Sequence, residues 1–198
     1  MSVIANCPDV VDLGTFTVNS DTLIVSDPCY SLTGEGQTII KDVKQGLWRA
    51  YVNRALVGRD SFHSTRNWAV FAVHEGYYTV AAVLPWEEGA VADIAVDSGQ
   101  AGIFDINVYN NDDTVSYEPK FGEHNREYLP KWYSACSELT LNSPYRAGVV
   151  VGGVVSAAGF GDGGYRVDTV SEYNESSKIV AVRVVFIEEV GRKWLGAS

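Results

Sequence analysis

Three short segments of the chain combine carboxylates, hydroxyls and glycines in a way that ordinary strand sequence does not. They are residues 26–30 (SDPCY), 97–102 (DSGQAG) and 159–165 (GFGDGGY). Each follows or interrupts a strand-like run, and β-sheet proteins usually carry binding and catalytic residues on the loops at strand ends. These three boxes are therefore where we expect a site.

The first box places a thiol close to a carboxylate, Cys29 next but one to Asp27. An Asp-Pro pair favours a turn, because proline fixes φ and the Asp side chain can bond the backbone two residues on. A carboxylate disfavours a nearby thiolate, which is the nucleophilic form of cysteine. None of His63, His74 and His124 has a spacing diagnostic of a Cys-His pair, so only the fold can decide whether one lies near Cys29.

The third box matches the pattern G-x-G-x-x-G through Gly159, Gly161 and Gly164. In a dinucleotide-binding fold a helix follows these glycines, whereas residues 165–170 (YRVDTV) continue as a strand. The motifs that accompany the glycine loop of a protein kinase are absent. Two interpretations stay open: a bulge or tight turn with Asp162 at its tip, or a turn whose backbone N–H groups meet a ligand.

No pattern in the chain predicts a metal or a cofactor. The polar run 107–114 supplies Asn and Asp oxygens but lacks the spacing of a calcium loop, and we expect it to be a mobile surface loop. Clustered Cys and His ligands of the zinc type and a G-x-S-x-G nucleophile elbow are both missing.

Charge and length limit the partners of the protein. Its 198 residues carry 15 Lys and Arg against 25 Asp and Glu, a formal net charge of -10, which works against binding to phosphate backbones and anionic lipids. No apolar run reaches the length of a membrane span. With a hydrophobic fraction of 46%, residues 1–198 predict one globular domain that contacts neither nucleic acid nor membrane.

Cysteine usage indicates a reducing compartment. Cys7, Cys29 and Cys136 lie far apart and form neither a CxxC pair nor an even disulfide framework. The N-terminus also lacks the basic region of a secretion signal. We therefore predict a cytoplasmic location.

Short runs rich in β-branched and aromatic residues, separated by Gly, Asn and Asp, predict a mostly β protein. The predicted strands cover residues 15–18, 22–26, 46–56, 68–74, 77–84, 92–96, 102–108, 147–157, 165–173 and 179–188. One helix is predicted from Pro130, because Trp132, Cys136 and Leu139 fall on one helical face. We expect a β-sandwich or a strongly bent antiparallel sheet with this one helix packed on it.

Two hairpins are predicted from turn residues between strand-like runs. Residues 67–74 should pair with residues 77–84 across an intervening Glu-Gly dipeptide. Residues 165–173 should pair with residues 178–187, and their alternation predicts one buried face and one face in water.

The boxes also resemble a family of small uncharacterised proteins from bacteria and their phages, a domain of unknown function. Its members are similar in carrying Asp-Pro-Cys-Tyr after a strand, a Val-Asp-Ser-Gly segment ending near an Asp, and a Gly-Asp-Gly-x-Tyr turn; here these stand at residues 27–30, 96–105 and 161–165. The resemblance implies a bacterial or phage source and a β-rich fold, but no activity. For a phage protein, the location would be the host cytoplasm or the virion.

The polar residues of the boxes are the candidate site. They are Asp27, Tyr30, Asp97, Asp105, Asp162 and Tyr165. If they meet in space, they form either a ligand site or a buried hydrogen-bond network. We expect a non-catalytic binding or assembly protein, phage-associated, with a protein partner or self-assembly and room for a small-molecule ligand. The alternatives are a hydrolase using paired carboxylates such as Asp97 and Asp162, and an inhibitor of a host defence protein.

Overall fold

Two antiparallel sheets stack on each other in the computed structural model, which describes residues 9–32, 34–59, 62–77, 86–116, 129–172 and 177–188. The six-stranded sheet has the order β1 (Asp9–Val18), β4 (Gly46–Arg59), β5 (Phe62–His74), β11 (Ile179–Val185), β10 (Gly163–Ser171) and β6 (Ile94–Val96). The five-stranded sheet has the order β3 (Thr38–Ile40), β2 (Leu23–Ser26), β7 (Gln100–Asp105), β9 (Gly153–Ala157) and β8 (Ala147–Val150). The helix α1 (Lys131–Asn142) and a 3-10 turn, η2 (Asp112–Thr114), complete the described elements. The expected β-sandwich with one helix is confirmed.

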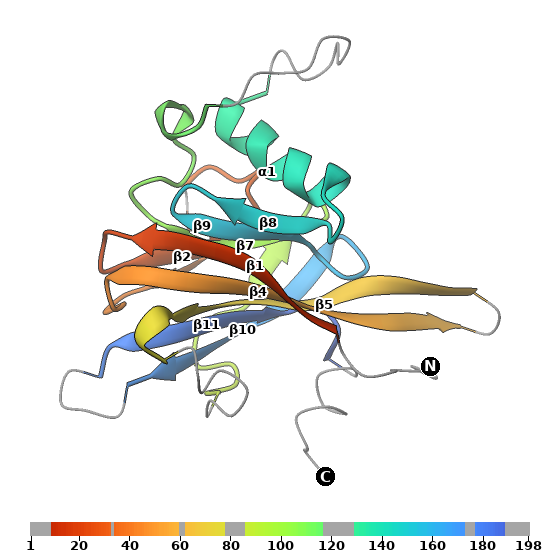
Figure 1. The fold of residues 1–198 in the computed structure, drawn as a ribbon, viewed down its shortest axis with the longest axis horizontal. Helices are drawn as coiled ribbons and strands as arrows, with labels where there is room; N and C mark the ends of the chain where they lie inside the picture. Colours follow the sequence, from red (N-terminus) through yellow and green to blue (C-terminus); the bar gives the residue numbers. More distant parts are fainter. Residues whose placement is uncertain are drawn as a thin grey trace.

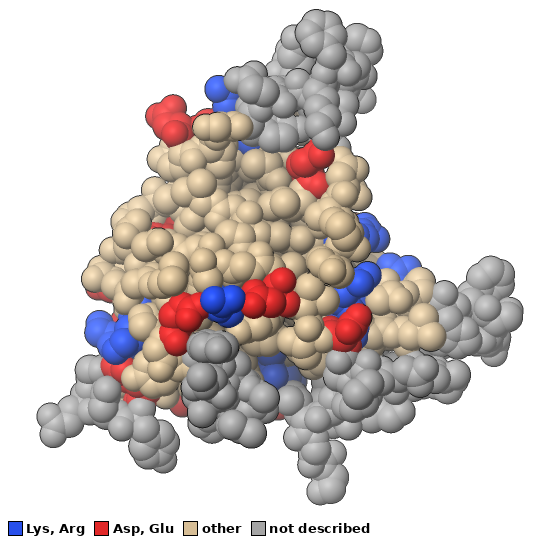
Figure 2. Space-filling model, in the orientation of Figure 1, with Lys and Arg blue, Asp and Glu red and all other residues tan. Residues whose placement is uncertain are grey.

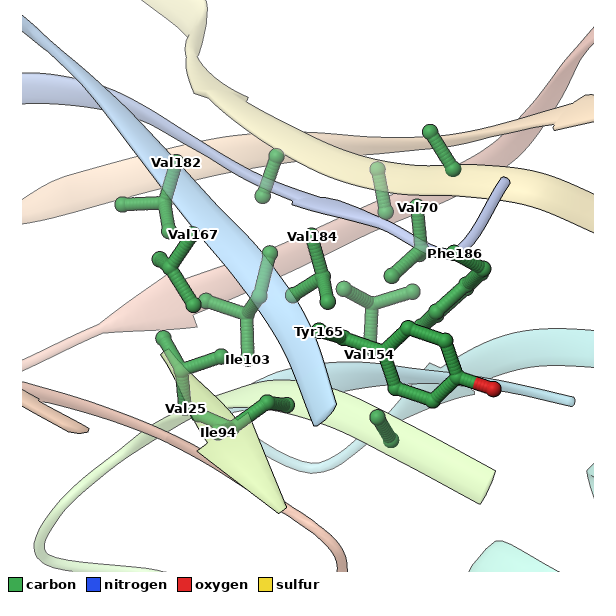
Figure 3. Packing of buried hydrophobic residues seen from close by; sticks show 14 of the residues in the cluster. Val25, Val70, Ile94, Ile103, Val154, Tyr165, Val167, Val182, Val184 and Phe186 are labelled. Carbon is green, nitrogen blue, oxygen red and sulfur yellow. The ribbon is translucent and has the colours of Figure 1, made fainter. Parts of the chain in front are cut away.

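The main core fills the space between the two sheets. Branched side chains from both inner faces interdigitate there, as Figure 3 shows for Val25 and Ile103 on one side and Val70 and Val182 on the other. Every second residue of a strand points to the same face, so the alternating valines and isoleucines of these strands place one apolar row in this layer.

The outer face of the five-stranded sheet is covered by α1 (Figure 1). Trp132 and Cys136 of the helix pack on Phe104 of β7, with the Trp132 and Phe104 ring centroids 5.0 Å apart. Because β7 is covered on both faces, all six of its residues are buried. The predicted helix, its apolar face and the core position of Cys136 are confirmed.

The predicted pairing of residues 165–173 with 178–187 is confirmed as β10 against β11, but the expected wet face is wrong. Five of the nine residues of β10 and six of the seven residues of β11 are buried. Residues 86–89 lie across the outer face, where Trp86 stacks on the Arg183 guanidinium at 4.4 Å and Gly89 N donates to Asp168 Oδ1 at 3.1 Å. Arg183 in turn donates to Asp168 Oδ2 at 2.6 Å, so a buried ion pair occupies the face that we expected in water.

The strand predicted over residues 67–74 lies within β5, but its predicted pairing with residues 77–84 and the two-residue turn between them are wrong. Ala69 to Val73 of β5 pair with β4 on one edge and with β11 on the other, so neither edge is free for residues 77–84. Glu75 and Gly76 belong to a helical turn rather than a two-residue hairpin turn. Residues 78–84 lie outside the described residues. The actual partner, β4, forms with β5 a long ribbon that extends beyond the rest of the sandwich (Figure 1).

Smaller differences concern where strands break. Residues 147–157, expected as one strand, form the hairpin β8–β9 around Gly152, whose φ of 64° suits the turn. The strand expected over residues 102–108 ends at Asp105, and the short strand β3 had no recognisable signal.

A close approach between β7 and β9 depends on Gly102. A Cβ at this position would overlap the Phe104 ring and the Val154 carbonyl oxygen. We therefore expect Gly102→Ala to lower the free energy of unfolding by about 1–3 kcal/mol, the typical cost of overpacking a core. Urea denaturation measures this loss. Gly164→Ala is the matched control, because its Cβ would meet only the Ile94 carbonyl oxygen at 4.0 Å. Equal stability of the two variants would contradict the tight packing of β7 on β9.

Candidate functional site

The first two boxes meet at the carboxylate of Asp27, which is fully buried (0% exposed). Its Oδ1 accepts hydrogen bonds from Cys29 N at 2.9 Å and from Ser98 Oγ at 2.6 Å. Its Oδ2 accepts from Asp97 N at 2.9 Å and from Ser98 N at 2.7 Å. Four donors occupy the acceptor sites of one carboxylate, so Asp27 holds two loops together rather than being free to move a proton.

Tyr30 and Asp97 form a second contact between the same two boxes. The Tyr30 hydroxyl donates to Asp97 Oδ2 at 2.7 Å. Partial burial, together with this hydrogen bond to a carboxylate, raises the pKa of Tyr30 above its ordinary value. The phenol therefore stays protonated and keeps donating, and the candidate residues Asp27, Tyr30 and Asp97 form one network.

Tyr109 is the central residue of this network that sequence reasoning missed. Its hydroxyl lies 2.8 Å from the Tyr30 carbonyl oxygen and 2.9 Å from Ser26 Oγ, and it accepts from Gln37 Nε2 at 3.0 Å. Burial raises the pKa of Tyr109 to about 12. The residue comes from the polar run 107–114, expected as a surface loop, and a lone aromatic residue in that run was the one available signal.

The third box forms a turn at residues 159–162, the feature that its two interpretations share. The Tyr165 hydroxyl donates to the Gly161 carbonyl oxygen at 2.6 Å, and Figure 3 shows this hydroxyl pointing away from the core. The turn abuts the second box, since Ala158 N donates to the Gly99 carbonyl oxygen at 2.9 Å. A Cβ on Gly99 would lie 4.0 Å from Asp162 Oδ1. Asp162 and Tyr165 thus belong to the same end of the sandwich as Asp27.

Asp105 is the one candidate that the fold places elsewhere. It ends β7, and the five residue steps from Gln100 cover about 17 Å at a typical strand rise. Its carboxylate is buried and accepts from Asn19 N at 2.6 Å and from Asn107 N at 3.0 Å. Asp105 therefore fastens two turns at the opposite end of the sheet and takes no part in the site.

A cavity of about 290 Å³ opens where the second and third boxes meet α1. Its lining residues are Arg66, Ser98, Gly99, Gln100, Tyr133, Ser137, Thr140, Leu141, Arg146, Ala157, Ala158, Gly159, Phe160 and Gly161. Ser98 links the cavity to the Asp27 network. On the wall, Gln100 Nε2 donates to Ser137 Oγ at 3.2 Å and Thr140 Oγ1 donates to Gln100 Oε1 at 3.1 Å.

Among the residues that the structure describes, none of those lining this cavity carries a carboxylate. Asp97 and Asp162 belong to the boxes that shape it, but their side chains are not part of its wall. Within the described ranges, no group of three or more His, Cys, Asp and Glu side chains could hold a metal ion. No described helix has both the length and the apolar character needed to cross a membrane.

Comparisons with protein-family models, curated proteins and solved structures found no match to this chain. The resemblance of the three boxes to bacterial and phage proteins therefore stays a prediction.

The role of Asp27 can be tested by an isosteric change. In the wild-type protein the donors around Asp27 face carboxylate oxygens, whereas in Asp27→Asn some of them would face an NH₂ group. We therefore expect a loss of about 3 kcal/mol in the free energy of unfolding. Urea denaturation measures the loss. Asp97→Asn is the control: Asp97 is exposed, and an amide oxygen still accepts from Tyr30, so we expect a change below about 1 kcal/mol. A large loss in the control alone would place the anchor at Asp97 instead.

Cys29 offers a test of reactivity. Although the residue is exposed, burial of its thiol and the interaction with Asp27 raise the pKa of Cys29 to about 12. The reactive thiolate is then scarce at pH 8, so iodoacetamide should modify Cys29 at least about tenfold more slowly in the folded protein than in urea. The rate should still be rising at pH 10. Mass spectrometry of the Cys29 peptide follows the reaction, and a plateau below pH 9 would show an activated thiol.

Proposed function

We propose that the protein is a non-catalytic binding protein whose binding site is the cavity between the second and third boxes. The proposal rests on the hydrogen bonds that the buried Asp27 carboxylate accepts. The Asp27 carboxylate accepts hydrogen bonds from Cys29, Asp97 and Ser98. These bonds fix the loop that forms one wall of the cavity. Such an arrangement shapes a concave surface on which the described lining residues supply no carboxylate for acid-base chemistry.

Exposed apolar side chains around the cavity support a protein partner or self-assembly as well. Leu141 and Phe160 line the cavity and are each 56% exposed, and Tyr145, which is 40% exposed, directly precedes the lining residue Arg146. Aromatic and aliphatic residues gathered at one place on a surface are characteristic of the centre of an interface. A ligand in the cavity and a partner over its rim are compatible.

The alternative functions have less support. For a carboxylate-pair hydrolase, Asp97 and Asp162 would have to line one concave pocket, and the cavity beside them has neither in its wall. For an inhibitor that presents an acidic surface, Figure 2 shows red and blue atoms interspersed on the face it displays, without a broad red field. Arg49, for example, contacts both Asp12 and Glu75. The phage-associated setting, in a virion or the host cytoplasm, is proposed on the resemblance alone.

Native mass spectrometry of the protein isolated gently from its own source tests the proposal. We expect a mass above that of the chain, from a retained small molecule, a partner or further copies. The variant Leu141→Trp should reduce this retention, because it narrows the cavity mouth from an exposed position. Leu47→Trp is the control, since Leu47 is similarly exposed but belongs to β4 and is not in the lining. A ligand-free monomer in every preparation would refute the binding function.

A further inference from the structure

The cavity lining contains two arginines, although the net charge of the protein is -10. Three other described arginines contact carboxylates: Arg49 pairs with Asp12 at 2.8 Å, Arg166 with Asp168 at 2.8 Å and Arg183 with Asp168 at 2.6 Å. Arg66 and Arg146, which line the cavity, make no ion pair with any residue in the described part of the chain. Arg66 is half-buried and Arg146 is exposed, so both guanidinium groups stay accessible to a ligand that enters the cavity.

Both arginines are held in place by single hydrogen bonds that leave most of their donors unused. Arg66 Nη1 donates to the Gly159 carbonyl oxygen at 3.1 Å, and its guanidinium lies 5.4 Å from the centroid of the Phe160 ring. Arg146 Nε donates to the Thr140 carbonyl oxygen at 3.2 Å. A guanidinium has five N–H donors in a planar fork that suits carboxylate and phosphate oxygens. Side chains fixed in advance lose less entropy when a ligand binds.

The backbone at Arg146 supports a role for this residue. Its φ of 52° lies in the left-handed region, which is uncommon for a residue with a Cβ. Neighbouring groups hold this conformation: Arg146 N donates to the Ser143 carbonyl oxygen at 3.1 Å, and Ala157 N donates to the Arg146 carbonyl oxygen at 2.8 Å. Backbone strain of this kind gathers at functional sites.

A third arginine lies next to the same segment. The Arg54 guanidinium is 5.4 Å from the centroid of the Tyr145 ring, and its Nε is buried without a hydrogen-bond partner in the described structure. Arg54 is not in the lining, but through Tyr145 it lies beside the segment that carries Arg146 and adds positive charge there.

The other residues of the lining indicate which uncharged part of a ligand the cavity would accept. The Ser98 and Thr140 hydroxyl groups already donate to Asp27 and Gln100, whereas Ser137 Oγ accepts from Gln100. Phe160 and Leu141 offer apolar surface at the mouth. A volume of about 290 Å³ is at the lower end of the range for small-molecule sites. The cavity therefore suits a small molecule with a charged end and an apolar or aromatic end.

We infer that the cavity binds a small organic oxyanion, a carboxylate or a phosphate ester, whose charged group lies between Arg66 and Arg146 and whose apolar body packs on Phe160 and Leu141. This inference deepens the proposed binding function and rests on it. Charge-assisted hydrogen bonds to two guanidinium groups supply the recognition, since they are stronger than bonds between neutral groups.

Isothermal titration calorimetry on the full chain tests the inference with phenyl phosphate, benzoate and the neutral benzyl alcohol as probes. We expect at least one anion to bind and the alcohol to bind at least about tenfold more weakly. Arg66→Gln and Arg146→Gln should each weaken the anion about tenfold or more, and added salt should weaken it further. Arg49→Gln is the matched control and should leave binding unchanged, because Arg49 lies outside the cavity and contacts carboxylates. Thermal unfolding of each variant checks that it is folded.

Each outcome decides the inference. A preference for phenyl phosphate or for benzoate supports it and identifies the charged group. Binding of benzyl alcohol as tight as that of the anions, or anion binding unaffected by both glutamine variants, overturns it while leaving a binding function in place. Absence of binding by all three probes also overturns it, and the native mass spectrum then decides the broader proposal separately.

Discussion

The fold depends on one buried charge at the point where the chain passes from one sheet to the other. Residues 97–99 join β6 of the six-stranded sheet to β7 of the five-stranded sheet, and Asp27 at the end of β2 holds them there. Burying a carboxylate is costly unless its hydrogen bonds are replaced, and here two backbone N–H groups and a hydroxyl of this crossing do so, with Cys29 N as the fourth donor. The same hydrogen bonds set the position of Ser98, which lines the cavity, and so they fix that part of the cavity wall.

The sequence predicted the architecture well where local pattern determines it. Alternating valines placed most strands, and the apolar face with Trp132 and Cys136 placed the helix. It failed where distant segments compete. The Glu-Gly dipeptide suggested a local hairpin, but β4 and β11 take both edges of β5. The outer face of β11 alternates like a wet surface, yet Trp86 covers Arg183 there, and nothing near either residue indicates that contact.

The sequence predicted part of the candidate site. Turn-forming boxes led to Asp27, Tyr30 and Asp97, because residues with special backbone roles stand out from strand composition. Asp105 has the same chemistry and was grouped with them, although it fastens other turns. Sequence reasoning missed Tyr109 and the two cavity arginines. Their hydrogen bonds and ion pairs depend on residues that are distant in the sequence, so a local sequence pattern does not predict them.

The packing on either side of the cavity is unequal. Arg66 projects from β5, whose central residues are hydrogen-bonded on both edges and packed in the main core, whereas Ser137, Thr140 and Leu141 belong to α1, which rests on a separate, smaller apolar cluster. Local opening free energies follow such differences in buried contact. The cavity lies between the sandwich, which has the larger apolar core, and a helix that packs on the smaller one, so α1 is the side of the cavity that we expect to open at the lower free energy.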